Sequence, residues 1–406
     1  MSGPAPRVDD AARPDSARGG GPRGDGPQGD GLRDDRPAGG DARVTHVSSV
    51  HRWTDNRIHY RECATLVEHG YRVTLVAVDT PVPGPKTAVR VIACPPVPRL
   101  RRMAFGSVRA VRTALKTNAS IYHLHDPELV WAVPYLRLRG KKVVWDAHED
   151  LPLDVQSKAY LRPVGRRVAQ VAARAILRVA ALANQVVAAT EPIAARFPPA
   201  KTTVVHNYPP LRLAEDSASP VTARPQAAVY VGLMAQRRGA FVMADAARSP
   251  LFPASWVLRA AGPMISPGFE AELAARPGWA DVDYLGVVPP EEARDLMLNA
   301  RVGLLLLQDT PAHRGGALPT KLFEYFAAGL PVIASDFEHW RPIIRDHDCG
   351  LLVDPSSPSE VAAAIARYAS DDQLALRHSA NARRLAVEQL NWTAEGQALL
   401  GVYARL

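Results

Sequence analysis

The chain has little of what several common protein classes require. Its 406 residues include only three cysteines, Cys63, Cys94 and Cys349, which lie far apart and match neither a paired metal-ligand spacing nor a disulfide framework. No stretch approaches the run of about eighteen uncharged apolar residues that a membrane-spanning helix needs. The N-terminus also lacks the apolar segment of a signal peptide. These absences predict a protein of the reducing cytoplasm.

Aromatic residues are scarce as well, at 6% of the chain, although the net charge is +8. Basic proteins often bind nucleic acid, anionic membranes or phosphorylated substrates. No aromatic RNA-binding strand, zinc finger or helix-turn-helix is recognisable, so nucleic acid is not an expected partner. The apolar fraction of 47% and the length indicate instead a globular protein large enough for two domains, each with its own core.

The order of the segments predicts a tail followed by two α/β domains. Residues 1–43 are rich in Gly, Pro, Asp and Arg, and too few large apolar side chains are present to offset the entropy of ordering, so we predict disorder there. From residue 44 to residue 210, buried strands alternate with helices, beginning with strands at 44–50 and 71–78 around a helix at 55–70. Residues 211–226 lack periodicity and predict a linker, and 227–390 repeat the α/β pattern.

Several polar side chains follow the strands of the first domain, at the edge where open α/β sheets bind ligands. His123 and His125 alternate onto one face of a strand, but no third ligand follows at a suitable spacing, so a metal site is not predicted. The next strand ends in His148 and Glu149, which are candidates for activating an acceptor. A solvated turn is the alternative. Arg57, in the loop after the first strand, is a further acceptor-side candidate.

The clearest motif of the second domain is LPTKLFEYFAAGLPVIASDF, a helix that leads into a buried strand. Lys321 lies in the first helical turn, where a cation is disfavoured unless an anion is near. Gly315 and Gly316, just upstream, would let backbone amides approach a phosphate at the helix N-terminus. An exposed ion pair between Lys321 and Glu324 is the plainer interpretation, and the helix alone does not decide between the two.

The segment PTKLFEYFAAGLPVIASD resembles the donor-site signature of the GT-B glycosyltransferases, specifically the retaining, family 4-like enzymes of cell-surface polysaccharide assembly, and the resemblance extends over about residues 44–406. It implies two Rossmann-like parallel-sheet domains that face each other across a cleft, with a C-terminal helix at 391–406 packing back on the first domain. Glu324 matches the residue that holds the ribose hydroxyls of a nucleotide sugar, and Lys321 matches a position beside the diphosphate.

The resemblance also assigns residues elsewhere. His125 corresponds to the active-site histidine that contacts the donor sugar, and Arg238 to one of two basic residues that face the diphosphate. Two positions depart from the pattern, because Leu233 replaces the other basic residue and Gly316 replaces a glutamate that faces the transferred sugar. No metal or other cofactor is expected.

The resemblance therefore predicts a hexosyltransferase-type enzyme that moves a sugar from a UDP- or GDP-linked donor to a glycan, lipid-linked or small-molecule acceptor. Peripheral contact with the inner face of the membrane is a further expectation. The arginines of a helical stretch at 163–189 are nevertheless better explained by a solvated face, because the stretch lacks the Trp and Phe that anchor interfacial helices. Other GT-B chemistry, such as a sugar-nucleotide epimerase or hydrolase, and an inactive sugar-nucleotide-binding subunit are the alternatives.

Overall fold

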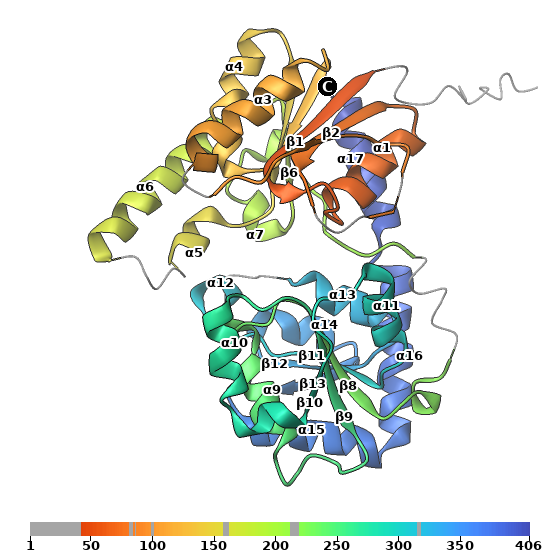
Figure 1. The fold of residues 1–406 in the computed structure, drawn as a ribbon. Helices are drawn as coiled ribbons and strands as arrows, with labels where there is room; N and C mark the ends of the chain where they lie inside the picture. Colours follow the sequence, from red (N-terminus) through yellow and green to blue (C-terminus); the bar gives the residue numbers. More distant parts are fainter. Residues whose placement is uncertain are drawn as a thin grey trace, which may run out of the picture. The chain divides into compact units, whose positions relative to one another are not determined.

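The computed structural model describes residues 42–80, 84–85, 87–98, 101–156, 162–211, 219–314 and 318–406. Residues 1–41 of the predicted disordered tail and residues 212–218 of the predicted linker lie outside this set. The described residues form two parallel sheets, of seven and six strands. This confirms the predicted α/β class with two Rossmann-like domains (Figure 1).

The first sheet consists of apolar strands in the order β3-β2-β1-β4-β5-β6-β7. Successive side chains point to opposite faces, so that Leu75 packs with Leu66 on one face while Val76 packs with Ala110 on the other. The strands are β1 (Arg43–Arg52), β2 (Arg72–Val78), β3 (Arg90–Cys94), β4 (Ile121–Leu124), β5 (Lys142–Ala147), β6 (Gln185–Ala188) and β7 (Thr202–Val204).

Helices cover both faces of this sheet, as a parallel sheet of apolar strands requires. One face packs against α3 (Ser107–Leu115), α4 (Ala132–Leu138) and the end of α6 (Pro163–Ala180). The other face packs against η1 (Ile58–Cys63), α1 (Ala64–Glu68) and α17 (Trp392–Ala404), which Figure 1 shows beside α1. The shorter helices are η2 (Arg102–Gly106), η3 (Pro127–Leu129), α5 (Leu151–Gln156), α7 (Glu191–Ala194) and η4 (Pro199–Lys201).

The second sheet has the order β10-β9-β8-β11-β12-β13 and is likewise covered on both faces. Its strands are β8 (Ala227–Val231), β9 (Val257–Ala261), β10 (Val282–Tyr284), β11 (Val302–Leu305), β12 (Val332–Ser335) and β13 (Gly350–Val353). Its helices are η5 (Val221–Ala223), η6 (Gln236–Arg238), α9 (Ala240–Ala247), α10 (Pro267–Ala274), η7 (Pro277–Asp281), α11 (Pro290–Leu298), α12 (Pro311–Arg314), α13 (Thr320–Ala327), η8 (Glu338–Trp340), α14 (Arg341–Ile344), α15 (Pro358–Ser370) and α16 (Asp372–Glu388).

Some element boundaries differ from the sequence-based predictions. The helix predicted at 55–70 begins only at Ile58, because the side chain of Asp55 accepts hydrogen bonds from the backbone N–H groups of Arg57 and Ile58 and so caps the turn before it. The helical stretch predicted at 163–189 ends at Ala180, and β6 lies within the range 184–190 for which the sequence also predicts a strand. These residues pair with β5 and β7 on both sides, and that pairing decides their conformation.

Helix α6 carries exposed valines next to exposed arginines. Val164, Val168 and Val171 keep 74%, 64% and 64% of their surface accessible, and Arg167 and Arg174 are exposed as well. Among the helices in the described part of the chain, none combines the length and the apolar character needed to traverse a lipid bilayer.

The C-terminal helix α17 ties the end of the chain to the first sheet. The indole N–H of Trp392 donates a hydrogen bond of 2.8 Å to the hydroxyl of Thr65, and the Trp392 side chain is 8% exposed. Farther along the helix, the hydroxyl of Tyr403 lies 3.1 Å from Nε2 of His46. The first domain is thus completed by residues from the far end of the chain.

We expect Trp392→Ala to lower the free energy of unfolding by roughly 3 to 5 kcal/mol, because it removes a large buried side chain and leaves the Thr65 hydroxyl without its donor. Urea unfolding followed by far-ultraviolet circular dichroism measures the change. Gln397→Ala, at an exposed position of the same helix, is the control and should change stability by less than about 0.5 kcal/mol. Equal unfolding midpoints for both variants would contradict this role of α17.

Candidate functional site

The N-terminal turn of α13 presents the pair that the sequence singled out. Nζ of Lys321 lies 2.5 Å from Oε2 of Glu324, so the ion pair of the plainer interpretation is present. Nη2 of Arg61, on η1, lies 4.0 Å from Oε1 of Glu324. The side chains of Lys321 and Glu324 are 24% and 11% exposed, so both can still be reached from solvent.

Two neighbouring arginines follow β8 at a tight turn. Arg237 and Arg238 end η6, and the next residue, Gly239, has a φ of 84°. A Cβ atom there would lie 2.5 Å from the carbonyl oxygen of Leu306, so only glycine allows this approach of η6 to the end of β11. Arg238 was predicted at this site. Arg237 was missed, although the adjacent arginines in the segment QRRG could have indicated it.

A cavity of about 370 Å³ brings residues of the two domains together. The second domain contributes Arg237, Arg238 and the start of α13 at Thr320. The first domain contributes, among others, His148 and Glu149, both predicted on the acceptor side. The predicted Gly315 and Gly316 lie outside the described residues.

Arg57 also borders this cavity, but its guanidinium is committed to the interior. It is 3% exposed, and its Nε, Nη2 and Nη1 atoms lie 2.9 Å from Glu62 Oε1, 3.0 Å from Asp146 Oδ1 and 2.8 Å from the carbonyl oxygen of Val205. Burial opposes the charged form, yet Asp146 and Glu62 raise the pKa of Arg57 above its ordinary value. Arg57 is therefore a buried cation at the cavity border, and each of its three guanidinium nitrogen atoms has a partner within the protein.

The imidazole of His125 is enclosed, whereas that of His148 is not. His125 is 2% exposed, with Nδ1 at 3.1 Å from Asp146 Oδ2 and Nε2 at 2.9 Å from His46 Nδ1. Burial lowers the pKa of His125, although its hydrogen bond to Asp146 and the charge of that residue work in the opposite direction. Nε2 of His148 lies 2.7 Å from the same Asp146 oxygen, and this side chain is 17% exposed. Of these two histidines, His148 borders the cavity and His125 does not; His206 and His313 also line it.

The C-terminal end of β1 is held by a buried carboxylate that sequence reasoning missed. Oδ2 of Asp126 accepts hydrogen bonds from the hydroxyl of Ser48 at 2.9 Å and from the backbone N–H of Val50 at 3.1 Å. Beside it, Nδ1 of His51 lies 3.2 Å from Asp55 Oδ2. Burial opposes protonation of His51, but its hydrogen bond to Asp55 and the charge of Asp126 raise its pKa to about 9. A cationic imidazole therefore stands near His148, at 5.1 Å between ring centroids.

Two groups of side chains in the described residues have the composition of a metal site. One consists of His46, Glu62, His123 and His125, and the other of His125, Asp146 and His148. The spacing argument found only His123 and His125, because the other candidate ligands come from β1, η1 and β5. The tertiary structure thus brings together candidate ligands that lie far apart in the sequence.

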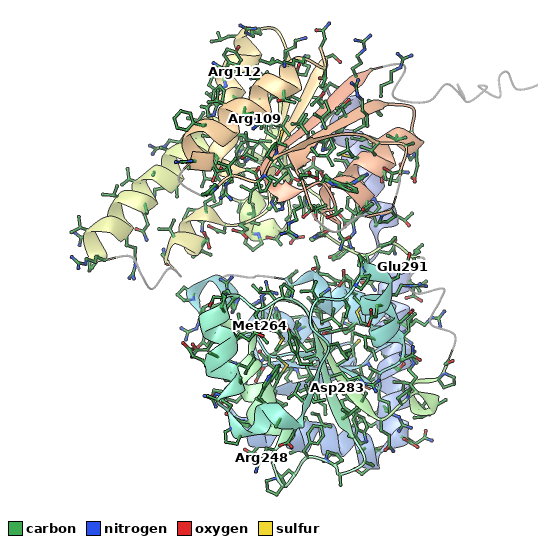
Figure 2. The ribbon with its side chains drawn as sticks, viewed as in Figure 1. Arg109, Arg112, Arg248, Met264, Asp283 and Glu291 are labelled. Atoms are coloured by element: carbon green, nitrogen blue, oxygen red, sulfur yellow. The ribbon has the colours of Figure 1, made fainter. Side chains whose placement is uncertain are left out.

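Two other charged regions lie outside this cavity. Asp281 and Asp283, which resemble a metal-binding D-x-D, lie at the N-terminal end of β10 and pair with Arg248 at 3.3 Å and Arg259 at 3.1 Å. Figure 2 shows Arg248 at the end of the second domain opposite α13.

A larger hollow of about 870 Å³ is lined in part by Arg314 and Arg341.

Both arginines of that larger hollow already have carboxylate partners. Arg314 pairs with Asp309, and Nε of Arg341 lies 2.6 Å from Asp336 Oδ1. Their charge is therefore balanced within the hollow. The smaller cavity, with Arg237 and Arg238 at its wall, is the better candidate for an anionic ligand.

Two family models match the chain, one for each domain. Residues 56–208 match the model described as Glycosyltransferase Family 4. Residues 225–371 match the model described as Glycosyl transferases group 1.

Among curated proteins, the chain is similar to phosphatidyl-myo-inositol mannosyltransferases. The Mycobacterium leprae protein is 34% identical over 142 residues, which are 34% of this chain and 36% of that protein. The Mycolicibacterium smegmatis protein is 34% identical over 92 residues, which are 22% of this chain and 24% of that protein. The similarity thus spans well under half of the length of these relatives.

Solved structures resemble nearly the whole chain. Sucrose-phosphate synthase from Thermosynechococcus elongatus matches with a TM-score of 0.68 at 19% identity, covering 89% of this chain and 98% of that one. Anabaena HepE in complex with UDP and glucose matches with a TM-score of 0.66 at 15% identity, covering 90% of this chain and 100% of that one. At these identities the likeness shows a shared fold.

Proposed function

Because the chain belongs to the GT-B glycosyltransferases, with a family 4 domain followed by a group 1 domain, we propose that it transfers a sugar from a UDP- or GDP-linked donor to an acceptor. The acceptor would be a glycan, a lipid-linked sugar or a small molecule, and the transfer would retain the anomeric configuration. A role in building cell-surface polysaccharide or glycoconjugate follows from such an acceptor. The HepE structures with UDP and with UDP-glucose support a nucleotide-sugar donor.

The observation that carries the proposal is the composition of the cavity walls. Arg237, Arg238 and the N-terminal turn of α13 form one wall, and these positive groups suit a diphosphate. As the sugar leaves the diphosphate, negative charge grows on the diphosphate oxygens, and fixed cations near them lower the barrier. Lys321, in the first turn of α13, would exchange its bond to Glu324 for the diphosphate, and Glu324 would then accept bonds from the ribose hydroxyls.

The opposite wall provides groups for the sugar and the acceptor. His148 and Glu149 line it, and His148 is bonded to Asp146 behind it. We infer that His148 contacts the transferring sugar and that His125 acts as a positioning residue, because it bonds the same oxygen of Asp146. Gly315 and Gly316 would cradle the phosphates, and Arg57 would orient Asp146 from below.

The function is tested by incubating the full chain with a panel of sugar nucleotides, with and without candidate acceptors. We expect nucleoside diphosphate to be released from one donor in proportion to glycosylated acceptor, both measured by mass spectrometry, and the product to have the anomeric configuration of the donor. Epimerised donor without an acceptor, or release of free sugar alone, would indicate other GT-B chemistry. Binding without any turnover would indicate an inactive subunit.

The same assay tests our proposal that no cation bridges the diphosphate. Since Arg237, Arg238 and Lys321 would carry the leaving-group charge, added Mg²⁺ or Mn²⁺ should leave the initial rate unchanged, and so should brief exposure to EDTA. A rate that falls in EDTA and returns with Mg²⁺ or Mn²⁺ would contradict this.

Glu324→Ala should weaken the binding of the nucleoside diphosphate about 10- to 100-fold, because a charged acceptor of hydroxyl hydrogen bonds is lost. Titration calorimetry with UDP and GDP measures the change. Glu292→Ala, at an exposed position of α11, is the control and should bind as the parent does. Unchanged affinity of the Glu324 variant would remove this residue from the donor site.

His148→Ala should lower kcat and kcat/KM together by about two to three powers of ten, with nucleoside diphosphate affinity preserved, if the ring stabilises charge only in the transition state. His125→Ala, which empties a fully buried position, should also lower the melting temperature. Turnover and melting are measured on the same preparations. A folded His148 variant with the parent kcat would end this assignment.

Peripheral contact with the cytoplasmic face of the membrane is the final part of the proposal. It is supported by α6, which carries exposed valines together with exposed arginines, a combination suited to an anionic lipid surface. We expect the protein to sediment with anionic vesicles and not with neutral ones, and Val168→Asp to reduce that binding. Equal recovery from both kinds of vesicle would argue against it.

A further inference from the structure

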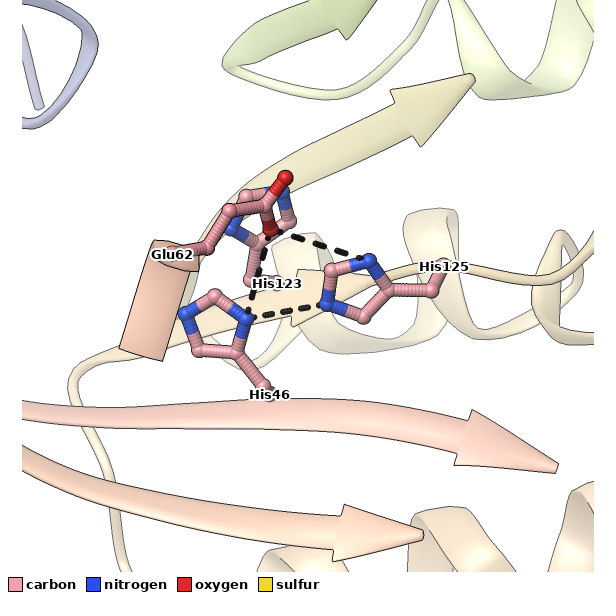
Figure 3. A group of neighbouring side chains, drawn as sticks. All are labelled: His46, Glu62, His123 and His125. Carbon is pink, nitrogen blue, oxygen red and sulfur yellow. Dashed lines mark hydrogen bonds and ion pairs between the residues drawn. The ribbon is translucent and has the colours of Figure 1, made fainter. Parts of the chain in front are cut away.

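Three imidazoles and one carboxylate converge in the interior of the first domain (Figure 3). They come from separate elements: His46 from β1, Glu62 from η1, His123 from β4 and His125 from the residue after β4. Their exposed fractions are 0%, 0%, 0% and 2%. Such a concentration of polar side chains in a dry interior is costly unless each polar atom has a partner.

Three of the polar atoms in this group have no such partner. Among the described residues, Nε2 of His123 and both carboxylate oxygens of Glu62 lack a hydrogen-bond partner, although Oε1 of Glu62 forms an ion pair with Arg57. The nearest ring nitrogen atoms measured from Glu62 Oε2 are His46 Nδ1 at 3.9 Å and His125 Nδ1 at 4.0 Å, both too far for a hydrogen bond. The unsatisfied atoms belong to the two ligand types that zinc prefers besides thiolate.

The spacing of the group suits a small ion. One potential ligand atom from each of the four residues lies within 4.8 Å of the others, and Nδ1 of His46 is 2.9 Å from Nε2 of His125. Ligand atoms around a tetrahedral zinc ion with bonds of about 2.0 Å are separated by roughly 3.3 Å. Small rotations of the His46 and His125 rings would move these two nitrogen atoms to that separation. The hydrogen bond between the rings would then be replaced by their bonds to the ion.

The second nitrogen of each imidazole is hydrogen-bonded from outside the group, and the second oxygen of Glu62 forms an ion pair. The hydroxyl of Tyr403 lies 3.1 Å from Nε2 of His46 and 2.9 Å from Nδ1 of His123. Asp146 Oδ2 lies 3.1 Å from Nδ1 of His125, and Arg57 Nε lies 2.9 Å from Oε1 of Glu62. Metal-binding histidines and carboxylates are oriented by such outer contacts, which leave the other atom free for the ion.

We propose that the first domain binds one Zn²⁺ ion through Nδ1 of His46, Oε2 of Glu62, Nε2 of His123 and Nε2 of His125. Three imidazoles and a carboxylate complete a tetrahedron without a water molecule, so the site is structural. The ion stabilises the junction of β1, β4 and η1 and fixes His125, and through it Asp146. This site is separate from the diphosphate and does not rest on the proposed transferase activity.

The group of His125, Asp146 and His148 is the competing location. It has three members, and its carboxylate already forms an ion pair with Arg57. Its histidine His148 is partly exposed, as the ligand of a catalytic or adventitious ion would be. The two locations share His125 but differ in Glu62 and His148, and this difference allows them to be separated.

The test begins with metal analysis of the full chain, purified without a polyhistidine tag and passed through gel filtration in metal-free buffer. We expect about one zinc per chain in the parent and in His148→Gln, and less than about a tenth of that in Glu62→Gln and His123→Gln. Each glutamine variant keeps a polar side chain of similar size or smaller, and circular dichroism shows whether it is folded. The readout is bound metal, so a failure of the transferase proposal leaves this test unaffected.

A second measurement on the parent avoids any dependence on variants. The metal is removed with a chelator, and Zn²⁺ or Co²⁺ is returned. Zinc should raise the melting temperature by at least about 5 °C, and cobalt should give the intense visible absorption of a four-coordinate ion.

Three results would overturn the proposal. The first is a parent that contains no transition metal and shows neither a melting shift nor the cobalt absorption. The second is zinc retained by Glu62→Gln and His123→Gln. The third is zinc lost only from His148→Gln, which would assign the ion to the competing group.

Discussion

The first domain depends on the buried carboxylate of Asp146. A charge taken out of water costs several kcal/mol unless oppositely charged and hydrogen-bonding groups surround it. Burial alone would raise the pKa of Asp146, but Arg57 and the imidazoles of His148 and His125 hold it well below its usual range. Through these partners Asp146 connects β5 to Arg57, the residue before η1, and to the residue that follows β4. The position of His148 at the cavity is therefore a consequence of charge compensation in the core.

This arrangement separates the groups that shape the site from those that can meet a ligand. Arg57 and His125 are enclosed and have their polar atoms bonded within the protein. His148 and Arg238 border the cavity. Interior groups of this kind lose little freedom when a ligand binds, because their side chains are already fixed. The proposed transfer requires charged groups that are already in place, because negative charge develops on the diphosphate during the reaction. Fixed groups stabilise that charge without a rearrangement of solvent.

The C-terminal end of the chain also contributes to the core of the first domain. Helix α17 follows the second domain in sequence, yet Trp392 and Tyr403 pack on the first sheet. The Tyr403 hydroxyl touches both His46 and His123, which are 357 and 280 residues away. The polar centre of the first domain is thereby closed by the last helix. Folding of that centre consequently requires the C-terminal segment to return to β1 and β4.

The sequence by itself determined the two α/β domains and most of the strands, because buried parallel strands are continuous apolar runs and the turns between them carry local signals. It also located Lys321 and Glu324, which are neighbours on one helix and need no distant partner to meet. Only the tertiary structure decided that His125 is enclosed while His148 borders the cavity, and that His46 and Glu62 join His123. Those relations arise from the parallel register of β1, β4 and β5 and the packing of η1, which no local pattern encodes.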